Sequence, residues 1–93
     1  MGARLTATRP PDGGTAAPGA AVVAVLELDP DWSPDGLRMW LDEVEVTERC
    51  GVRTDRAFPP RRAEVVLTGV EEGEHEARLA WVGGEESWRF AVG

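Results

Sequence analysis

The chain has 93 residues, a formal net charge of −7 and 42% hydrophobic residues, which suffices for one small domain with a modest core. The acidic balance argues against a nucleic-acid backbone or an anionic membrane as a partner. The longest apolar run, residues 20–28, contains Glu27 and is far shorter than the roughly 18 residues of a bilayer span, and no apolar segment typical of a signal peptide follows the N-terminus.

The first elements in chain order are short and interrupted by turn residues. Residues 3–8 predict a strand with Leu5 and Ala7 on one face. Residues 10–14, Pro-Pro-Asp-Gly-Gly, then break the strand, because proline removes a donor and glycine permits positive φ. We expect residues 15–19 to form a linker.

Two longer strands follow on either side of an acidic loop. Residues 20–28 predict a strand whose even positions point inward, because Glu27 must face water. Residues 29–36 are rich in Asp and Pro and predict a turn, and residues 37–42 alternate again. Val44 and Val46 predict a short further strand.

The last part of the chain carries the clearest strand pattern. Residues 48–62 include two adjacent prolines and suit an edge strand or a loop. Residues 63–68, 74–82 and 86–92 each alternate apolar and polar side chains between glycine-rich turns. About seven strands and no significant helix predict an all-β, immunoglobulin-like antiparallel sandwich that spans residues 1–93 as a single domain. The core predicted from the inward positions comprises Val22, Ala24, Leu26, Leu28, Leu37, Met39, Leu41, Val65, Leu67, Ala77, Leu79, Trp81, Trp88, Phe90 and Val92.

Four short motifs resemble bacterial immunoglobulin-like domains of the fibronectin-III-like type. Residues 37–47, LRMWLDEVEVT, resemble the third-strand signature of that family, and residues 73–75 resemble the Gly-x-His that opens its sixth strand. Residues 88–92 resemble its closing Trp-x-Phe-x-Val, and residues 11–13 fit its first turn. Glu43 departs from the pattern, since the family usually has glycine there, so we expect a looser turn or one of another type after residue 42.

The resemblance implies a role rather than a reaction. Domains of this family are mainly non-catalytic spacer, adhesion or accessory modules of surface, secreted and envelope-attached bacterial proteins. It therefore implies an extracytoplasmic location, although no signal peptide is visible in this chain. We expect a monomer that contacts a protein or a carbohydrate, with neither nucleic acid binding nor direct membrane insertion. All ten basic residues are Arg, and Lys, Ile, Asn and Tyr are absent, which indicates a GC-rich coding sequence.

One candidate site is the acidic loop. Asp29, Asp31, Ser33 and Asp35 alternate along it, and oxygen ligands at such spacing could wrap a Ca²⁺ ion. The loop fails as an EF-hand because Pro34 takes the sixth position, where that motif requires glycine. The alternative interpretation is a solvated turn whose side chains cap their own backbone.

The other candidate site is the outward face around Trp40. In the immunoglobulin arrangement Arg38 and Trp40 would lie beside Arg78 and Val82, with Arg89 on the next strand. Trp and Arg are enriched at binding hot spots, so this face could contact a protein or the flat face of a sugar. Alternatively an arginine stacks over Trp40 and shields it.

The remaining reactive residues do not form a catalytic set. His75 is the only histidine, and we expect it to bond a nearby backbone or loop group. Cys50 is the only cysteine, so it forms no internal disulfide, and we expect a small residue near a strand end. No residue pattern indicates a nucleophile with its base, so we predict no enzyme. The glutamates on turns and outward positions indicate solvated charge; these are Glu71, Glu72, Glu74, Glu76, Glu85 and Glu86.

Overall fold

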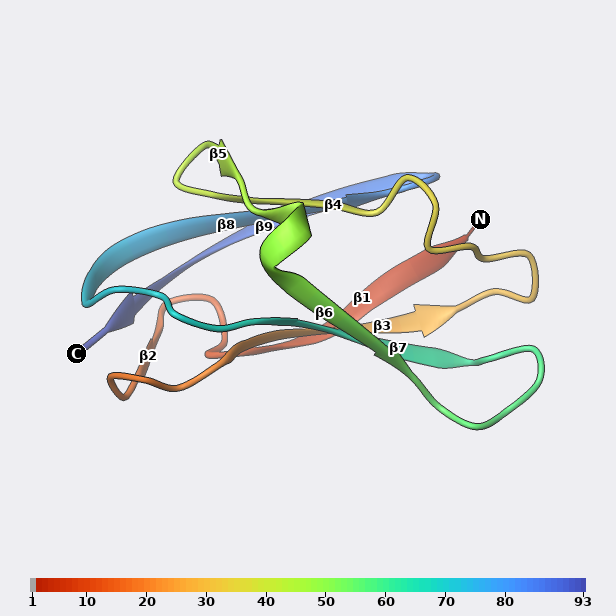
Figure 1. Cartoon of the computed structure of the whole chain (residues 1–93), viewed down its shortest axis with the longest axis horizontal. Coiled ribbons are helices and arrows are strands. Elements are labelled where there is room, and N and C mark those ends of the chain that lie inside the picture. Colours follow the sequence, from red (N-terminus) through yellow and green to blue (C-terminus); the bar gives the residue numbers. More distant parts are fainter. Residues whose placement is uncertain (1) are drawn as a thin grey trace.

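Two β-sheets pack face to face (Figure 1), and a layer of apolar side chains lies between them. The computed structural model describes residues 2–93, which contain nine strands. The four-stranded sheet has the order β1, β3, β7, β6, with bounds Ala3–Arg9, Val22–Leu28, Arg62–Leu67 and Cys50–Thr54. The five-stranded sheet has the order β2, β9, β8, β4, β5, with bounds Gly14–Ala16, Gly84–Val92, Gly73–Trp81, Arg38–Leu41 and Val44–Glu45.

The strand order is that of an immunoglobulin sandwich. We take β1 and β2 as two halves of the first strand and β5 as a short extra strand. The first, second, fifth and fourth strands (β1, β3, β7 and β6) then form one sheet, and the third, sixth and seventh (β4, β8 and β9) form the other. All pairings are antiparallel except that of β2 with β9. The predicted all-β, immunoglobulin-like fold is therefore confirmed. The helical structure in residues 2–93 is the single 3₁₀ turn Thr47–Arg49, and no helix in that range is long and apolar enough to cross a bilayer.

The prediction of a linker at residues 15–19 is partly wrong, because Gly14–Ala16 form β2. The strand lies parallel to β9, with Thr15 opposite Ala91. The backbone N–H of Gly13 also donates to the carbonyl of Arg89 at 2.7 Å. Partners more than 70 residues away decide this strand, and its three residues carry no alternation of their own.

A bulge in β1 overturns one predicted face. Leu5 lies opposite Leu26 and points inward, but the register shifts between Leu5 and Ala7, so Ala7 lies opposite Val25 and is exposed. The hydroxyl of Thr6 donates to the carbonyl of Val25 at 3.2 Å at this point. An extra residue inserted in one strand moves every later side chain to the other face.

The stretch expected as an edge strand or loop contains both. β6 pairs only with β7 and is largely exposed, and residues 55–61 form the loop between them. The strand predicted at residues 37–42 is shorter in the structure, where β4 spans Arg38–Leu41. The next strand, β5, ends at Glu45, and the side chain of Val46 is buried in the core.

The core lies between the sheets and agrees with the predicted inward positions. Thirteen of those residues are buried, while Leu37 and Leu41 are only partly buried. Trp32 from the acidic loop also packs partly against the core, which anchors that loop. Buried residues that the alternation did not predict are Val23, Val46, Ala63 and Val70.

Candidate functional site

Trp40 lies on the outer face of the five-stranded sheet with an arginine stacked on its ring. The register places Trp40 on β4 directly opposite Arg78 on β8. The guanidinium carbon of Arg78 lies 4.2 Å from the ring centroid of Trp40, which is a cation–π contact. The predicted shielding of Trp40 by an arginine is therefore present.

The other arginines of this face are paired with glutamates. Arg38 contacts Glu45 at 3.2 Å, and Arg89 lies 3.6 Å from Glu76. Arg78 itself also lies 3.6 Å from Glu85. All these side chains are substantially exposed, so each pair contributes at most about 1 kcal/mol to stability.

The structure does not bring all five predicted contact residues together. Arg89 lies opposite Glu76, whereas Val82 follows β8 in the turn before β9. Val82 lies six positions after Glu76, which is about 20 Å along an extended chain. Trp40 and Arg78 instead line a shallow hollow of about 120 Å³ with Glu43, Glu76 and Ser87. This volume is below the roughly 300 Å³ of a typical small-molecule pocket.

A polar cluster formed by His75, Asp42 and Glu71 lies at one end of the same sheet. His75 Nδ1 lies 2.6 Å from Asp42 Oδ2, and His75 Nε2 lies 2.7 Å from the carbonyl oxygen of Glu71. Asp42 also accepts a hydrogen bond from the backbone N–H of Glu76 at 2.8 Å. The histidine thus ties the turn after β4 to the loop before β8. The predicted structural role of His75 is confirmed.

In the polar cluster, His75 and Asp42 each stabilise the charged form of the other. Burial lowers the pKa of His75, but the hydrogen bonds to Asp42 and Glu71 outweigh burial, and the pKa is raised above 6.5. Burial raises the pKa of Asp42, yet the hydrogen bonds from His75 and Glu76 bring it below 3.8. Both ring nitrogens of His75 are engaged, so neither has a lone pair directed at a substrate or metal. A groove of about 350 Å³ adjoins the polar cluster and includes Phe90 and Arg89 in its lining.

Cys50 begins β6, as expected of a small residue near a strand end. Its Sγ lies 3.4 Å from the carbonyl oxygen of Val46 and 3.5 Å from the sulfur of Met39. Burial raises the pKa of the thiol, and the charge of Arg49 offsets only part of that effect. Cys50 is therefore a packed thiol and a poor nucleophile at neutral pH.

The acidic loop folds as consecutive turns. The backbone N–H of Trp32 donates to the carbonyl of Asp29 at 3.0 Å, and the N–H of Asp35 donates to the Ser33 hydroxyl at 3.2 Å. This is the local capping that the alternative interpretation expected. Across residues 2–93, no three Asp, Glu, His or Cys side chains are grouped so that they could hold a metal ion.

Calcium binding by Asp29, Asp31 and Asp35 is one of two interpretations of this loop, and no cluster of possible ligands in residues 2–93 supports it. We expect the melting temperature to remain unchanged when millimolar CaCl₂ replaces EDTA, because a ligand stabilises a fold only by binding it. Thermal unfolding followed by tryptophan fluorescence measures this. An upward shift that disappears in Asp31→Asn would restore the calcium site.

Sequence reasoning missed a second charged cluster. Glu64 on β7 lies within 4.0 Å of three arginines, Arg9, Arg53 and Arg62. The outward position of Arg62 follows from the alternation along β7, whereas that of Arg9 depends on the bulge in β1. The pairings of β1 with β3, of β3 with β7 and of β6 with β7 bring the cluster together.

Comparison with known proteins yields distant likenesses. Neither a protein-family model nor a curated protein sequence matches the chain. Among solved structures it is similar to titin kinase with its flanking domains, with 10% identity, 98% coverage of this chain and 16% of that one, and a TM-score of 0.47. It is also similar to a three-domain immunoglobulin fragment of titin, with 13% identity, coverages of 100% and 32%, and a TM-score of 0.47. Domains 4 and 5 of the S-layer protein SbsC share 18% identity, with coverages of 97% and 53% and a TM-score of 0.46.

The chain thus spans about a third or less of the two titin chains and about half of the S-layer chain. Its class rests on its own strand order, which makes it an immunoglobulin-like sandwich domain.

Proposed function

We propose that this domain is a non-catalytic immunoglobulin-like module that holds neighbouring parts of a larger protein at a set distance. The supporting observation is that the two ends of the described chain lie at opposite poles of an elongated sandwich (Figure 1). The Cα atoms extend over 38 Å along the long axis and over 23 and 22 Å across it.

Hydrogen bonds attach each end to its own pole. The carbonyl of Gly2 accepts from the N–H of Asp29 at 2.9 Å, beside the turn that follows β8. The N–H of Gly93 donates to the carbonyl of Ala16 at 2.9 Å, where β9 ends. A chain that enters at one pole and leaves at the other adds the full length of the sandwich to whatever it connects.

The sequence suggests the wider setting. The motifs at residues 37–47 and 88–92 and the use of Arg alone as the basic residue support a bacterial, exported or envelope-associated parent protein. The partner in that setting is a protein, and the module itself is a monomer. These statements extend the proposal and follow from the resemblance rather than from a site.

A protein of three copies joined end to end tests the spacer role. We expect each added copy to lengthen the particle by about the 38 Å of one sandwich, as measured by small-angle X-ray scattering. Trp40→Ala in every copy serves as the control and should leave the scattering profile unchanged, since a spacer does not use that face. A particle folded back to the length of one copy would contradict the proposal.

The alternative is a binding module that uses the face around Trp40. It predicts that Trp40→Ala abolishes binding of a protein or sugar while the fold is retained. Arg78→Ala is the matched variant, because it uncovers the ring without removing it and should strengthen binding to a sugar face. Titration of the parent protein's glycan or protein ligands against these two variants separates the two functions.

A further inference from the structure

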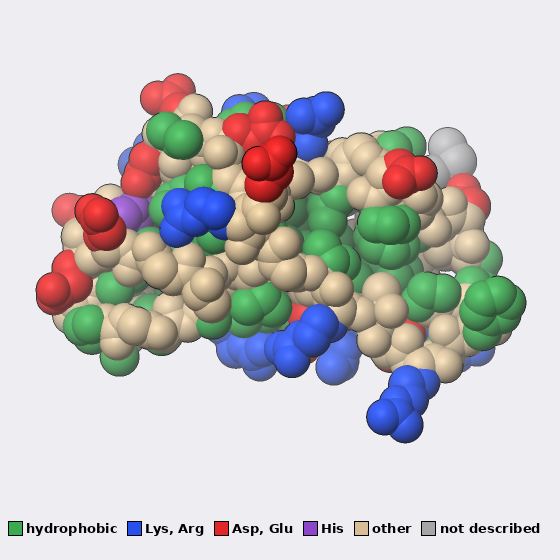
Figure 2. All heavy atoms as spheres, in the orientation of Figure 1, with side chains coloured by type: hydrophobic (Ala, Val, Ile, Leu, Met, Phe, Trp, Pro, Cys, Tyr) green, Lys and Arg blue, Asp and Glu red, His purple; other side chains and the backbone are tan. Residues whose placement is uncertain are grey.

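Four of the ten arginines share one surface, the outer face of the four-stranded sheet. We call it the arginine face; it carries Arg4 and Arg9 on β1, Arg53 on β6 and Arg62 on β7. The acidic residues on these four strands are Glu27 and Glu64. Four positive and two negative charges leave this face a surplus of two, although the whole chain carries −7. Figure 2 shows arginines along the lower margin of the molecule, beneath this sheet, and acidic side chains mostly along the upper margin and the left end.

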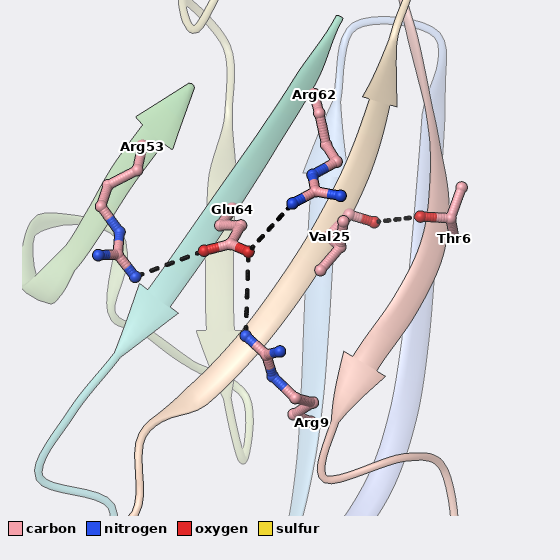
Figure 3. Close-up of polar contacts among 6 residues, drawn as sticks. All are labelled: Thr6, Arg9, Val25, Arg53, Arg62 and Glu64. Atoms are coloured by element: carbon pink, nitrogen blue, oxygen red, sulfur yellow. Dashed lines mark hydrogen bonds and ion pairs between the residues drawn. The ribbon is translucent and has the colours of Figure 1, made fainter. Parts of the chain in front are cut away.

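Three of these arginines converge on one carboxylate (Figure 3). Arg53 lies 3.4 Å from Glu64, Arg9 lies 3.9 Å from it and Arg62 lies 4.0 Å from it. Only Arg53 is close enough for a hydrogen bond to Glu64. Each guanidinium has five N–H donors, so most donors of the cluster remain accessible to another molecule.

The cluster contributes little to the fold. The side chains of Arg9, Arg53 and Arg62 are 66%, 74% and 63% exposed. Ion pairs with arginines this exposed give little stability, because water solvates the guanidinium groups well, whereas the Glu64 carboxylate is only 23% exposed. Because three arginines share Glu64, one of them can turn to a carboxylate of a partner while the other two stay close to Glu64.

The overall negative charge does not prevent an anion from reaching this face. Electrostatic potential at physiological ionic strength decays over ~8 Å. The sandwich is 22 to 23 Å across its short axes, so the acidic residues of the far sheet are largely screened. Local charge therefore decides what this surface attracts.

The dimensions of the face select the kind of anion. Three strand spacings separate β1 from β6, which is about 14 Å, and Arg4 and Arg9 are five residues apart, or about 17 Å. Val25 and Val66 form a small apolar floor between the arginines. A sulfated polysaccharide or a nucleic acid would extend beyond this area onto the acidic ends of the molecule.

We propose that the arginine face docks an acidic segment of a partner protein, about five or six residues long, that presents its carboxylates to Arg9, Arg53 and Arg62. The bonds are charge-assisted and noncovalent, and arginine is enriched at protein interfaces for this reason. The spacer role does not require this surface, so the inference stands apart from it.

Titration with a fluorescent octaglutamate peptide tests the proposal by NMR and by fluorescence anisotropy. In low salt we expect amide shifts confined to the outer face of the four-stranded sheet, and weaker binding as salt is raised. Arg53→Ala with Arg62→Ala should weaken binding about tenfold, since two exposed charge contacts are lost. Arg38→Ala with Arg89→Ala is the matched control, because those residues form similar single pairs on the other sheet, and it should leave binding unchanged.

Glu64→Gln separates a docking surface from a merely structural cluster. If the face binds anions, removing the central carboxylate strengthens peptide binding several-fold. Weaker binding in that variant would overturn the proposal, as would no binding in low salt or equal losses in the two double variants. Tighter binding of a heparin oligosaccharide or DNA of the same net charge at this face would also overturn it, in favour of those ligands.

Discussion

Glu43 is the residue whose backbone conformation least suits its side chain. Asp42 and Glu43 form the two-residue turn between β4 and β5, and their φ angles are 51° and 69°. A turn with positive φ at both central positions matches the twist of a hairpin, and glycine is favoured at the second position. The looser turn that the glutamate led us to expect is therefore absent, and the chain forms a tight two-residue hairpin turn with a glutamate where glycine is favoured.

Glu43→Gly should stabilise the domain by about 0.5–1 kcal/mol. Glycine adopts positive φ without the clash that a Cβ causes, and this gain exceeds the extra chain entropy of the unfolded state. Urea unfolding monitored by tryptophan fluorescence measures the difference. Glu86→Gly on β9 is the control and should destabilise the domain by a similar amount, because its backbone is already extended. A loss of stability in Glu43→Gly would contradict the assigned strain.

His75 can satisfy both of its partners only as an imidazolium. The Asp42 carboxylate and the Glu71 carbonyl both accept hydrogen bonds, so both ring nitrogens must donate. The neutral ring carries one N–H and would lose one of the two bonds. This geometry explains why the pKa of His75 is raised.

The stability contributed by His75 should depend on pH. Because the folded pKa lies above the unfolded value of about 6.5, the contribution is complete below that pH and is lost as pH rises through the folded pKa. We expect the difference in unfolding free energy between the natural protein and His75→Gln to be largest below about pH 6.5 and to shrink as the pH rises above it. As the only histidine, His75 gives one set of ring signals in an NMR titration, and a midpoint below 6.5 would refute the assignment.

At the scale of elements, the hairpin of β8 and β9 needs its two glycines for different reasons. Gly83 has a φ of 97° in the turn, where only glycine is unstrained. Gly84 belongs to β9, and a Cβ there would lie 2.7 Å from three ring atoms of Trp81. The sequence presents both as one turn signal, and the structure assigns one to the turn and one to the packing of an aromatic ring.

Gly84→Ala should destabilise the domain by about 1–3 kcal/mol. The Trp81 ring cannot easily move aside, because it is buried and its Nε1–H donates to the carbonyl of Ala3 at 3.1 Å. Thermal unfolding measures the loss. The double variant Gly84→Ala with Trp81→Leu should show a smaller effect of the alanine, and an equal effect would mean that the ring is not the obstacle.

Strands with strong alternation were predictable, and strands defined by distant pairing were not. β3, β7, β8 and β9 follow the predicted parity, with Val23 on β3 as a buried residue at an outward position, because the inner face of each strand is buried. β2 is invisible in the sequence, since its three residues gain a strand conformation only beside β9. The bulge in β1 was equally hidden, as polar and small residues on both sides of it fit either face.

At the scale of the whole molecule, one shared core holds the two sheets together without a disulfide. Leu26 is fully buried on β3, whereas its neighbour Val25 points to the outer face and is only partly buried. Leu26→Ala should cost about 2–5 kcal/mol, a large part of the 5–15 kcal/mol that such a domain has. Val25→Ala should cost clearly less. Chemical denaturation of the two variants tests the inward parity of β3, and equal losses would contradict it.

Alternation of side chains, turn residues and composition determined the fold class and most of the core, because burial of one face is a local property that repeats along the chain. Contacts among residues far apart in sequence were decided only by the tertiary structure. The stacking of Arg78 on Trp40 and the convergence of Arg9, Arg53 and Arg62 on Glu64 depend on which strands lie side by side and in which register. Side-chain charge and type are written in the sequence, but the distance between two charges is a property of the assembled sheets.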